Sequence, residues 1–232
     1  MDLFPYIATA FAAYFLGSIP TGYLIAKVQG IDIRTVGSGN IGATNAMRVL
    51  GKRAGIFVLI GDALKGWAAV VVGKFIWNVL IDPNFTDNLT APINKDMIVC
   101  GDWARRESFA LLAGIFAILG HNYTCWLKFK GGKGIATSCG VYLALAPLAC
   151  VLAVSTWVIT LFATRYVSIA SIVAAIALPT AVALTKDSPV LTGVTIGIGA
   201  LAVYKHKSNL KRLLNGTEHR FGAKDPPAPP AP

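Results

Sequence analysis

The chain has 232 residues, of which 55% are hydrophobic and only 14% charged, and its net charge is +10. A soluble globular domain usually contains about 25% charged residues, and a disordered chain combines low hydrophobicity with high charge. The composition therefore excludes both classes and indicates an integral membrane protein. The excess of Lys and Arg is first a sign of topology, and the basic patches lack the form of a DNA-reading element, so no nucleic-acid partner is expected.

Apolar segments approaching the roughly 20 residues of a membrane-spanning helix recur along the chain. We expect about seven transmembrane helices, at Leu3–Ala26, Ile56–Leu80, Ser108–Leu127, Ile135–Leu148, Ala149–Thr164, Val167–Leu184 and Val190–Tyr204. Without the break near Pro147 the count falls to six or five. The N-terminal segment has no Lys or Arg before its apolar run, so we interpret it as a retained helix rather than a signal peptide.

Charge predicts the orientation. With the N-terminus outside and seven spans, the inside segments hold 15 of the 21 basic residues, and the outside segments hold only Lys95, Arg105, Arg106 and Lys186. This distribution satisfies the positive-inside rule. We therefore predict an all-α integral membrane protein with a cytoplasmic C-terminus. Residues 1–222 would form one polytopic domain, 81–107 an external segment and 223–232 a Pro-rich disordered tail.

The first of three polar segments on the predicted cytoplasmic side is GSGNIGATNAMRVLGKRAG, residues 37–55. Its glycines can expose successive backbone N–H groups to an anion, and an arginine fork suits phosphate. The candidate ligands are Gly37, Ser38, Gly39, Asn40, Thr44, Asn45 and Arg48. A flexible surface loop is the alternative. The GxGxxG spacing of its glycines also occurs in dinucleotide-binding motifs. We reject that interpretation, because the flanking element is a membrane helix rather than a strand.

The second segment, KFKGGKGIATS (128–138), carries Gly131, Gly132, Lys133 and Gly134 just before an apolar helix. Backbone amides, one lysine and a helix N-terminus together favour phosphate binding. The segment is not a Walker A motif, because the first glycine of that motif would fall at Leu127 and Gly134 replaces the Ser/Thr. ATP hydrolysis is therefore not supported. The alternative is that the lysines only anchor the chain at the membrane surface.

The third segment, residues 204–222, places His206 and Asn209 three residues apart, on one face of a continuing helix. The composition of the same segment also predicts a basic helix that lies on anionic lipid. We expect the segment both to lie on the membrane and to bring His206 and Asn209 to the site. Within the second span, Asp62 and Lys65 are predicted to form a structural pair. The cysteines show no CxxC spacing and the three histidines are not paired, so no metal or cofactor is expected.

These segments together predict an enzyme or carrier for a phosphorylated small molecule at the inner membrane face. The runs GSGNIGATNAMRVLGKRAG, GH followed by WLKFKGGKGIATS, and HxxNxxR with a later GxExxFG resemble the bacterial acyl-phosphate:glycerol-3-phosphate acyltransferases, the PlsY family. The resemblance extends from Gly17 to Gly222, with the order and spacing of the motifs kept. Two departures are a long segment at 81–107 and Thr124 where members more often have Pro.

The resemblance implies a reaction at the bacterial cytoplasmic (inner) membrane. A fatty acyl phosphate would donate its acyl group to the 1-hydroxyl of glycerol 3-phosphate, giving lysophosphatidic acid and phosphate, the first step of phospholipid synthesis. It implies Ser38, Arg48, Lys133, His206 and Asn209 as catalytic residues. It assigns Gly131, Gly132 and Gly134 to the phosphate loop, Thr44 and Ser171 to phosphate contact, and Glu218 to bracing the C-terminal segment.

Several roles stay open at this level. His206 is either the general base or only orients the glycerol hydroxyl while a substrate phosphate takes the proton. We prefer a hydrogen-bonding Ser38 to a nucleophilic one. The His-x-x-x-x-Asp motif of the other acyltransferase class is absent, since Trp126, Lys211 and Lys224 stand at the fifth place after the three histidines. The acyl chain would lie along a lipid-facing groove. The alternative function is a membrane transporter of an organic phosphate.

Overall fold

The computed structural model describes residues 3–81 and 100–223, with the backbone alone for 100–105. Within those ranges all regular secondary structure is helical. The helices are α1 (Phe4–Ser18), α2 (Thr21–Val28), α3 (Ala43–Leu50), α4 (Lys52–Leu80), α6 (Cys100–Asn122), the 3-10 helix η2 (Cys125–Leu127), α7 (Ile135–Leu145), α8 (Pro147–Thr164), α9 (Val167–Thr185), α10 (Pro189–Lys205) and α11 (Lys207–Leu214). The Pro-rich tail from 224 and residues 82–99 of the expected external segment lie outside the described residues.

Each predicted span coincides with a helical segment of the structure. Five segments are long and apolar enough to cross a membrane, and α7 and α10 are apolar but shorter. The count of seven crossings therefore stays a prediction. The third candidate span, Arg106–Leu127, agrees with the predicted Ser108–Leu127. The helix α6 itself begins earlier, at Cys100, and so takes in the end of the segment expected to be an external loop.

Proline explains two of the helix boundaries. The first predicted span is broken between α1 and α2, where Pro20 lacks an N–H and disfavours a helical conformation at Ile19. The predicted break near Pro147 is confirmed. Ala146 adopts an extended φ of −146°, and Pro147 then opens α8 at its first turn, where a missing N–H costs nothing.

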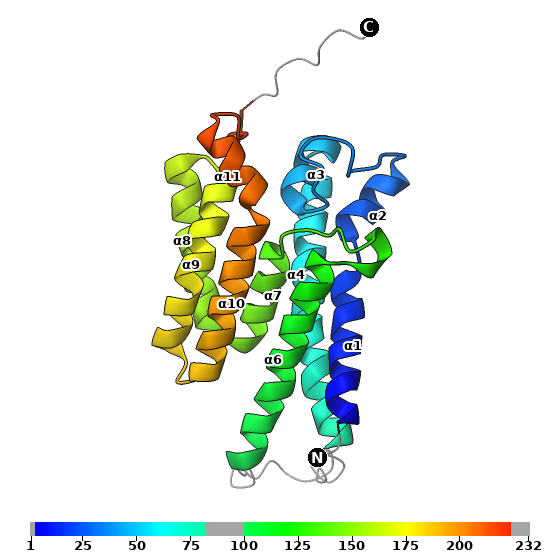
Figure 1. Cartoon of the computed structure of the whole chain (residues 1–232), viewed down its shortest axis with the longest axis vertical. Helices are drawn as coiled ribbons and strands as arrows, with labels where there is room; N and C mark the ends of the chain where they lie inside the picture. The colour runs from blue at the N-terminus through cyan, green and yellow to red at the C-terminus, as the bar shows by residue number, and fades with distance from the viewer. Residues whose placement is uncertain (1–2, 82–99, 224–232) are drawn as a thin grey trace, which may run out of the picture.

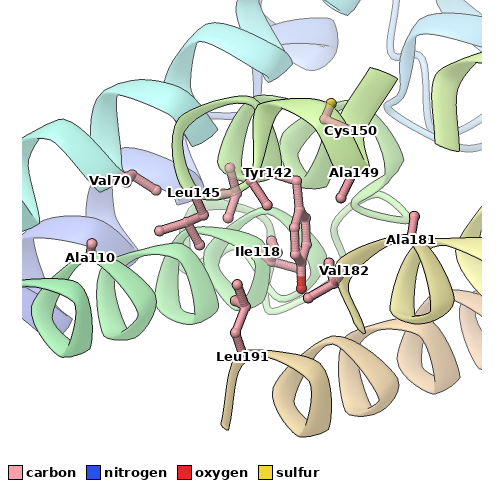
Figure 2. Close-up of a cluster of buried hydrophobic side chains, with 12 residues drawn as sticks. Val70, Ala110, Ile118, Tyr142, Leu145, Ala149, Cys150, Ala181, Val182 and Leu191 are labelled. Atoms are coloured by element: carbon pink, nitrogen blue, oxygen red, sulfur yellow. The ribbon is translucent and has the colours of Figure 1, made fainter. Parts of the chain in front are cut away.

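The helices form two groups joined by α7. In Figure 1, α1, α4 and α6 stand together on one side and α8, α9 and α10 on the other, with α7 between them. Figure 2 shows the buried cluster that joins the groups. It draws side chains from α4, α6, α7, α8, α9 and α10 around the fully buried ring of Tyr142. The Tyr142 hydroxyl donates to Thr195 Oγ1 of α10 at 2.7 Å.

Glycine allows α4 and α7 to pack backbone to backbone. A Cβ added at Gly140 of α7 would lie 1.8 Å from the carbonyl oxygen of Ala63, and one added at Gly66 of α4 would lie 2.2 Å from that of Thr137. Such close approach is a common device of membrane helices, which have little hydrophobic drive to associate within lipid.

All three polar segments lie at one end of the bundle. The segment with α3, the loop between η2 and α7, and the segment with α11 are grouped there in Figure 1, whereas α1 begins at the opposite end. The helix directions thus gather in space three motifs that are distant in sequence.

We expect Gly140→Val to separate α4 from α7 and to destabilise the fold by about 1–3 kcal/mol, the usual cost of overpacking. Thermal unfolding of the detergent-purified protein measures the loss. Gly197→Val on α10 is the matched control, because an added Cβ there has no atom within 4 Å. Equal melting temperatures for the two variants would contradict the packing account.

Candidate active site

Asn45 organises the first polar segment. It is 2% exposed in α3, and its Oδ1 accepts the Ser38 backbone N–H at 2.8 Å. Its Nδ2 donates to the carbonyls of Ile33, Val36 and Asn40 at 2.9–3.3 Å. The side chain predicted to bind substrate therefore ties the turn to the helix that carries Arg48.

The rest of this segment presents polar groups outward. Asn40 Oδ1 accepts the Gly42 N–H at 2.8 Å, which closes the turn into α3. Ser38 and Thr44 are exposed. Gly37 has φ +59°, in the left-handed region, and a Cβ there would lie 2.3 Å from Asn45 Oδ1. Instead of a flexible loop, the motif is a turn pinned to a short amphipathic helix.

The glycine loop of the second segment lies flat on the end of α6. Gly131 N–H donates to the Asn122 carbonyl at 3.2 Å, and Gly132 N–H donates to the His121 carbonyl at 3.0 Å. A Cβ at Gly132 would lie 2.1 Å from His121 Nε2. These glycines are therefore required for close packing on α6, in addition to any contact with a ligand.

A buried ionic cluster lies beneath that loop. Lys65 Nζ and Asp62 Oδ1 are 2.8 Å apart, with both side chains about 95% buried, and Lys65 also donates to the Ile19 carbonyl. His121 Nδ1 lies 3.6 Å from the same Asp62 oxygen. The predicted structural pair is confirmed, and it joins α4 to the break between α1 and α2 and to the histidine that supports Gly132.

The third segment brings α10 and α11 to the same place. His206 caps the junction between the two helices and Asn209 lies in the first turn of α11; both are buried. Asn209 Nδ2 donates to Glu218 Oε1 at 2.6 Å, and Arg212 Nε donates to Glu218 Oε2 at 2.7 Å. Glu218 therefore braces the segment through both partners, as the resemblance implied.

Lys133 connects the glycine loop to this third segment by donating a short hydrogen bond from Nζ to Asn209 Oδ1. Burial lowers the pKa of Lys133 to about 8; Glu218 acts to raise it, and the nearby Arg212 and Arg48 lower it further. Arg48 Nε is buried and has no hydrogen-bond partner among the described residues. Arg48 and Arg212 thus lie close enough to Lys133 to act on its charge, and Glu218 is the carboxylate that acts on it. This excess of positive charge favours an anionic ligand.

His206 lies next to this cluster in a defined tautomer. Its Nδ1 is 2.7 Å from the Ala202 carbonyl, which can only accept, so Nδ1 carries the proton and Nε2 keeps its lone pair. Burial and the Lys133 ammonium lower the pKa of His206 to about 4. The imidazole is therefore neutral near pH 7 and offers Nε2 as a hydrogen-bond acceptor.

The structure thus gathers Arg48, Lys133, His206 and Asn209 from all three segments, and Asn45 links Ser38 to them. Ser171 is placed differently. Its hydroxyl donates to the Val167 carbonyl and accepts from Trp157 Nε1, within the α8–α9 pair. Among the described residues, no group of three or more His, Cys, Asp and Glu side chains could hold a metal ion.

Sequence reasoning missed the support beneath the loop. His121 and Asn122 hold the glycine loop through their carbonyls, and Lys205 Nζ donates to the Asn122 carbonyl at 2.9 Å. The one available hint was polar residues, GHN, at the end of an apolar helix. The spacing to the glycine loop could not reveal which backbone groups meet.

The fold and site define a helical membrane protein with a cationic, hydrogen-bonded site at one end of its bundle. The family model described as glycerol-3-phosphate acyltransferase matches residues 7–216. The glycerol-3-phosphate acyltransferase of Geotalea daltonii is 45% identical over 215 residues, covering 93% of this chain and 97% of that protein. That of Geobacter metallireducens is 47% identical, with 91% and 95% covered. The chain belongs to the glycerol-3-phosphate acyltransferase family.

Solved structures agree with this assignment. The crystal structure of PlsY (YgiH), an integral membrane glycerol 3-phosphate acyltransferase, in its glycerol 3-phosphate form has a TM-score of 0.76 and 35% sequence identity, covering 94% of this chain and 96% of that one. Its lysophosphatidic acid form gives 0.74 and 34%, covering 94% and 95%. The protein is therefore an integral membrane protein of the PlsY fold.

We expect Asn45→Ala to release the turn before α3, because it removes four hydrogen bonds and leaves buried backbone groups without partners, at about 1–3 kcal/mol. Amide hydrogen exchange across residues 33–42 should accelerate. Thr35→Ala, which removes a single exposed hydrogen bond in the same turn, should leave the exchange unchanged. Protection equal to wild type in Asn45→Ala would overturn the role assigned to this side chain.

Proposed function

We propose that the protein transfers a fatty acyl group to the 1-hydroxyl of glycerol 3-phosphate, giving lysophosphatidic acid. The observation that carries the proposal is the excess of positive charge around Lys133, where Arg48 and Arg212 are opposed by the Glu218 carboxylate, beside the neutral, buried His206. A phosphate monoester dianion complements that charge. The solved PlsY relatives, one in its glycerol 3-phosphate form and one in its lysophosphatidic acid form, support this choice of substrate and product.

The donor in this proposal is an acyl phosphate. The substrate hydroxyl oxygen attacks the acyl carbon and forms the ester bond, and the bond from that carbon to the phosphate oxygen breaks, with both electrons leaving on phosphate. Because this mixed anhydride has a good leaving group, binding and alignment of two anions supply most of the rate. A chain without His-x-x-x-x-Asp fits such a donor.

His206 orients the hydroxyl in this mechanism. Its pKa of about 4 makes it a weak base in the free enzyme, whereas its Nε2 can accept a hydrogen bond from the glycerol hydroxyl. The proton then goes to the departing phosphate. Of the two roles that the sequence left open, the environment of the ring favours orientation.

The anion-binding roles follow from the remaining groups. Lys133 and Arg48 bind phosphate oxygens, Asn209 positions Lys133, and Gly134 is the N-cap residue of α7. Ser38 and the outward-facing groups of its turn contribute hydrogen bonds to the second anion. The further candidates are Gly37, Gly39, Asn40, Thr44, Gly131 and Gly132, with Asn45 acting through the turn; Ser171 remains a candidate only if its hydroxyl leaves Trp157.

We place the site on the cytoplasmic face of the bacterial inner membrane, with the N-terminus outside, seven spans and one domain over residues 1–222. The basic residues of the three polar segments support this side. A transporter would place polar groups near the membrane midplane. The charged residues within α4 do not favour this alternative, because Asp62 pairs with Lys65, which also donates to the Ile19 carbonyl. No cofactor enters the mechanism.

A direct assay tests the donor. The purified protein, given palmitoyl phosphate and glycerol 3-phosphate, is expected to release phosphate only when both are present, and palmitoyl-CoA is expected to give no turnover. Turnover of the CoA ester would overturn the donor assignment. Failure with both donors, together with uptake of glycerol 3-phosphate into sealed vesicles, would favour the transporter.

The pH profile tests the role of Lys133. Its pKa of about 8 lies below the usual value of 10.5, so its charge is present below pH 8 and lost above it. We therefore expect kcat/KM for glycerol 3-phosphate to fall about tenfold per pH unit above pH 8. In Lys133→Arg the positive charge persists at higher pH. The pH at which kcat/KM begins to fall should therefore rise by more than one unit. If that pH does not change, the loss of activity reports the titration of a group other than Lys133.

A further inference from the structure

Lys205 joins the end of α10 to the end of α6. Its Nζ donates to the Asn122 carbonyl at 2.9 Å and lies 4.0 Å from the centre of the Tyr123 ring. Hydrogen bonding and a cation–π contact together use the ammonium at a defined place rather than leaving it in solvent. The two residues joined are 83 positions apart in sequence.

The carbonyl that Lys205 contacts also holds the glycine loop. Asn122 O accepts the Gly131 N–H at 3.2 Å, and the Asn122 side chain lies against Gly134, where an added Cβ would be 2.8 Å from Oδ1. The turn that carries this carbonyl is itself fixed, because Tyr14 of α1 donates its hydroxyl to the Tyr123 carbonyl at 2.7 Å. One anchored acceptor therefore contacts both the loop that bears Lys133 and the helix that leads to His206.

The Lys205 contact lies at the C-terminal end of α10, where a small tilt of the helix produces the largest displacement. Among the described residues, the other side-chain hydrogen bond between α10 and the helices α6 or α7 is that from Tyr142 to Thr195. It lies ten residues earlier in α10, or about 15 Å along the helix axis. A tilt of about 4° around that point would move the end of α10 by about 1 Å. A misplacement of that size can cost an enzyme about 10²-fold in rate.

We propose that Lys205 is a positioning residue, which sets His206 and Asn209 against the glycine loop through the Asn122 carbonyl. The inference rests on the proposed acyl transfer. Lys205 acts through its neighbours and does not itself touch substrate. Because it immediately precedes His206, any shift of the lysine is passed directly to the imidazole and to the first turn of α11.

Lys207 provides a matched control. It carries the same charge two residues later, is exposed, and lies 4.7 Å from the Tyr204 ring, with Nζ 3.3 Å from that hydroxyl. Its described contacts stay within the α10–α11 end, so it joins no second helix to this one. A general attraction of anions by positive charge would require Lys205 and Lys207 alike, whereas positioning requires only Lys205.

The test compares Lys205→Met, Lys205→Arg and Lys207→Met as detergent-purified full chains, with palmitoyl phosphate and glycerol 3-phosphate. We expect Lys205→Met to lower kcat at least tenfold with KM for glycerol 3-phosphate within threefold of wild type. Lys205→Arg should recover most of the rate, and Lys207→Met should match wild type. An unchanged kcat in Lys205→Met, or a raised KM that high salt abolishes, would overturn the proposal.

Hydrogen exchange provides a readout that does not need activity. In Lys205→Met the amides of residues 131–134 and of the α10–α11 junction should exchange faster, and in Lys207→Met they should not. If the wild type turns over neither donor, the acyl-transfer proposal fails. The exchange comparison then still tests whether Lys205 positions the glycine loop and the α10–α11 junction. Lys205→Gln replaces the Met variant if that one does not fold. Wild-type protection in the folded variants would refute positioning by Lys205.

Discussion

The hydrogen bond from Lys133 to Asn209 is the contact on which the site depends. Lys133 lies in the glycine loop, which packs on α6 of the first helix group, and Asn209 follows α10 of the second. Those groups share a core through α7 and the buried cluster around Tyr142. At the end of the bundle, the side-chain hydrogen bonds of Lys133 and Lys205 join the glycine loop and the end of α6 to the α10–α11 junction. The geometry of an anion site is therefore set where the two groups meet.

An excess of positive charge at this site determines which ligands it can bind. Glu218 is occupied by Asn209 and Arg212, and burial lowers the pKa of Lys133 toward neutrality. Arg48 Nε remains without a partner among the described residues. The free site is thus organised around positive charge that a phosphate would neutralise. Such preorganised groups stabilise charge without moving at the moment of reaction, which suits the proposed transfer, in which the leaving group is an anion.

Sequence predicted the helical membrane class and the approximate spans, and it located the three polar segments, because hydropathy and glycine-rich composition are local properties. It did not predict that residues 43–50 would be helical, although Asn45 at the start of α3 proves to hold the preceding turn. The break at Pro20 follows from a rule on proline that hydropathy ignores. The roles of His121, Asn122 and Lys205 could not be predicted, because two of them act through backbone carbonyls and the third through a contact 83 residues away.

A double-mutant cycle on Lys133→Met and Asn209→Ala tests the central claim most directly, with kcat/KM for glycerol 3-phosphate as the readout. If the two side chains act as one unit across the helix groups, the double variant should be scarcely worse than the poorer single variant. The interaction free energy would then be of the same order as the smaller single effect. Losses that multiply independently, giving an interaction free energy near zero, would contradict the claim that this contact assembles the site.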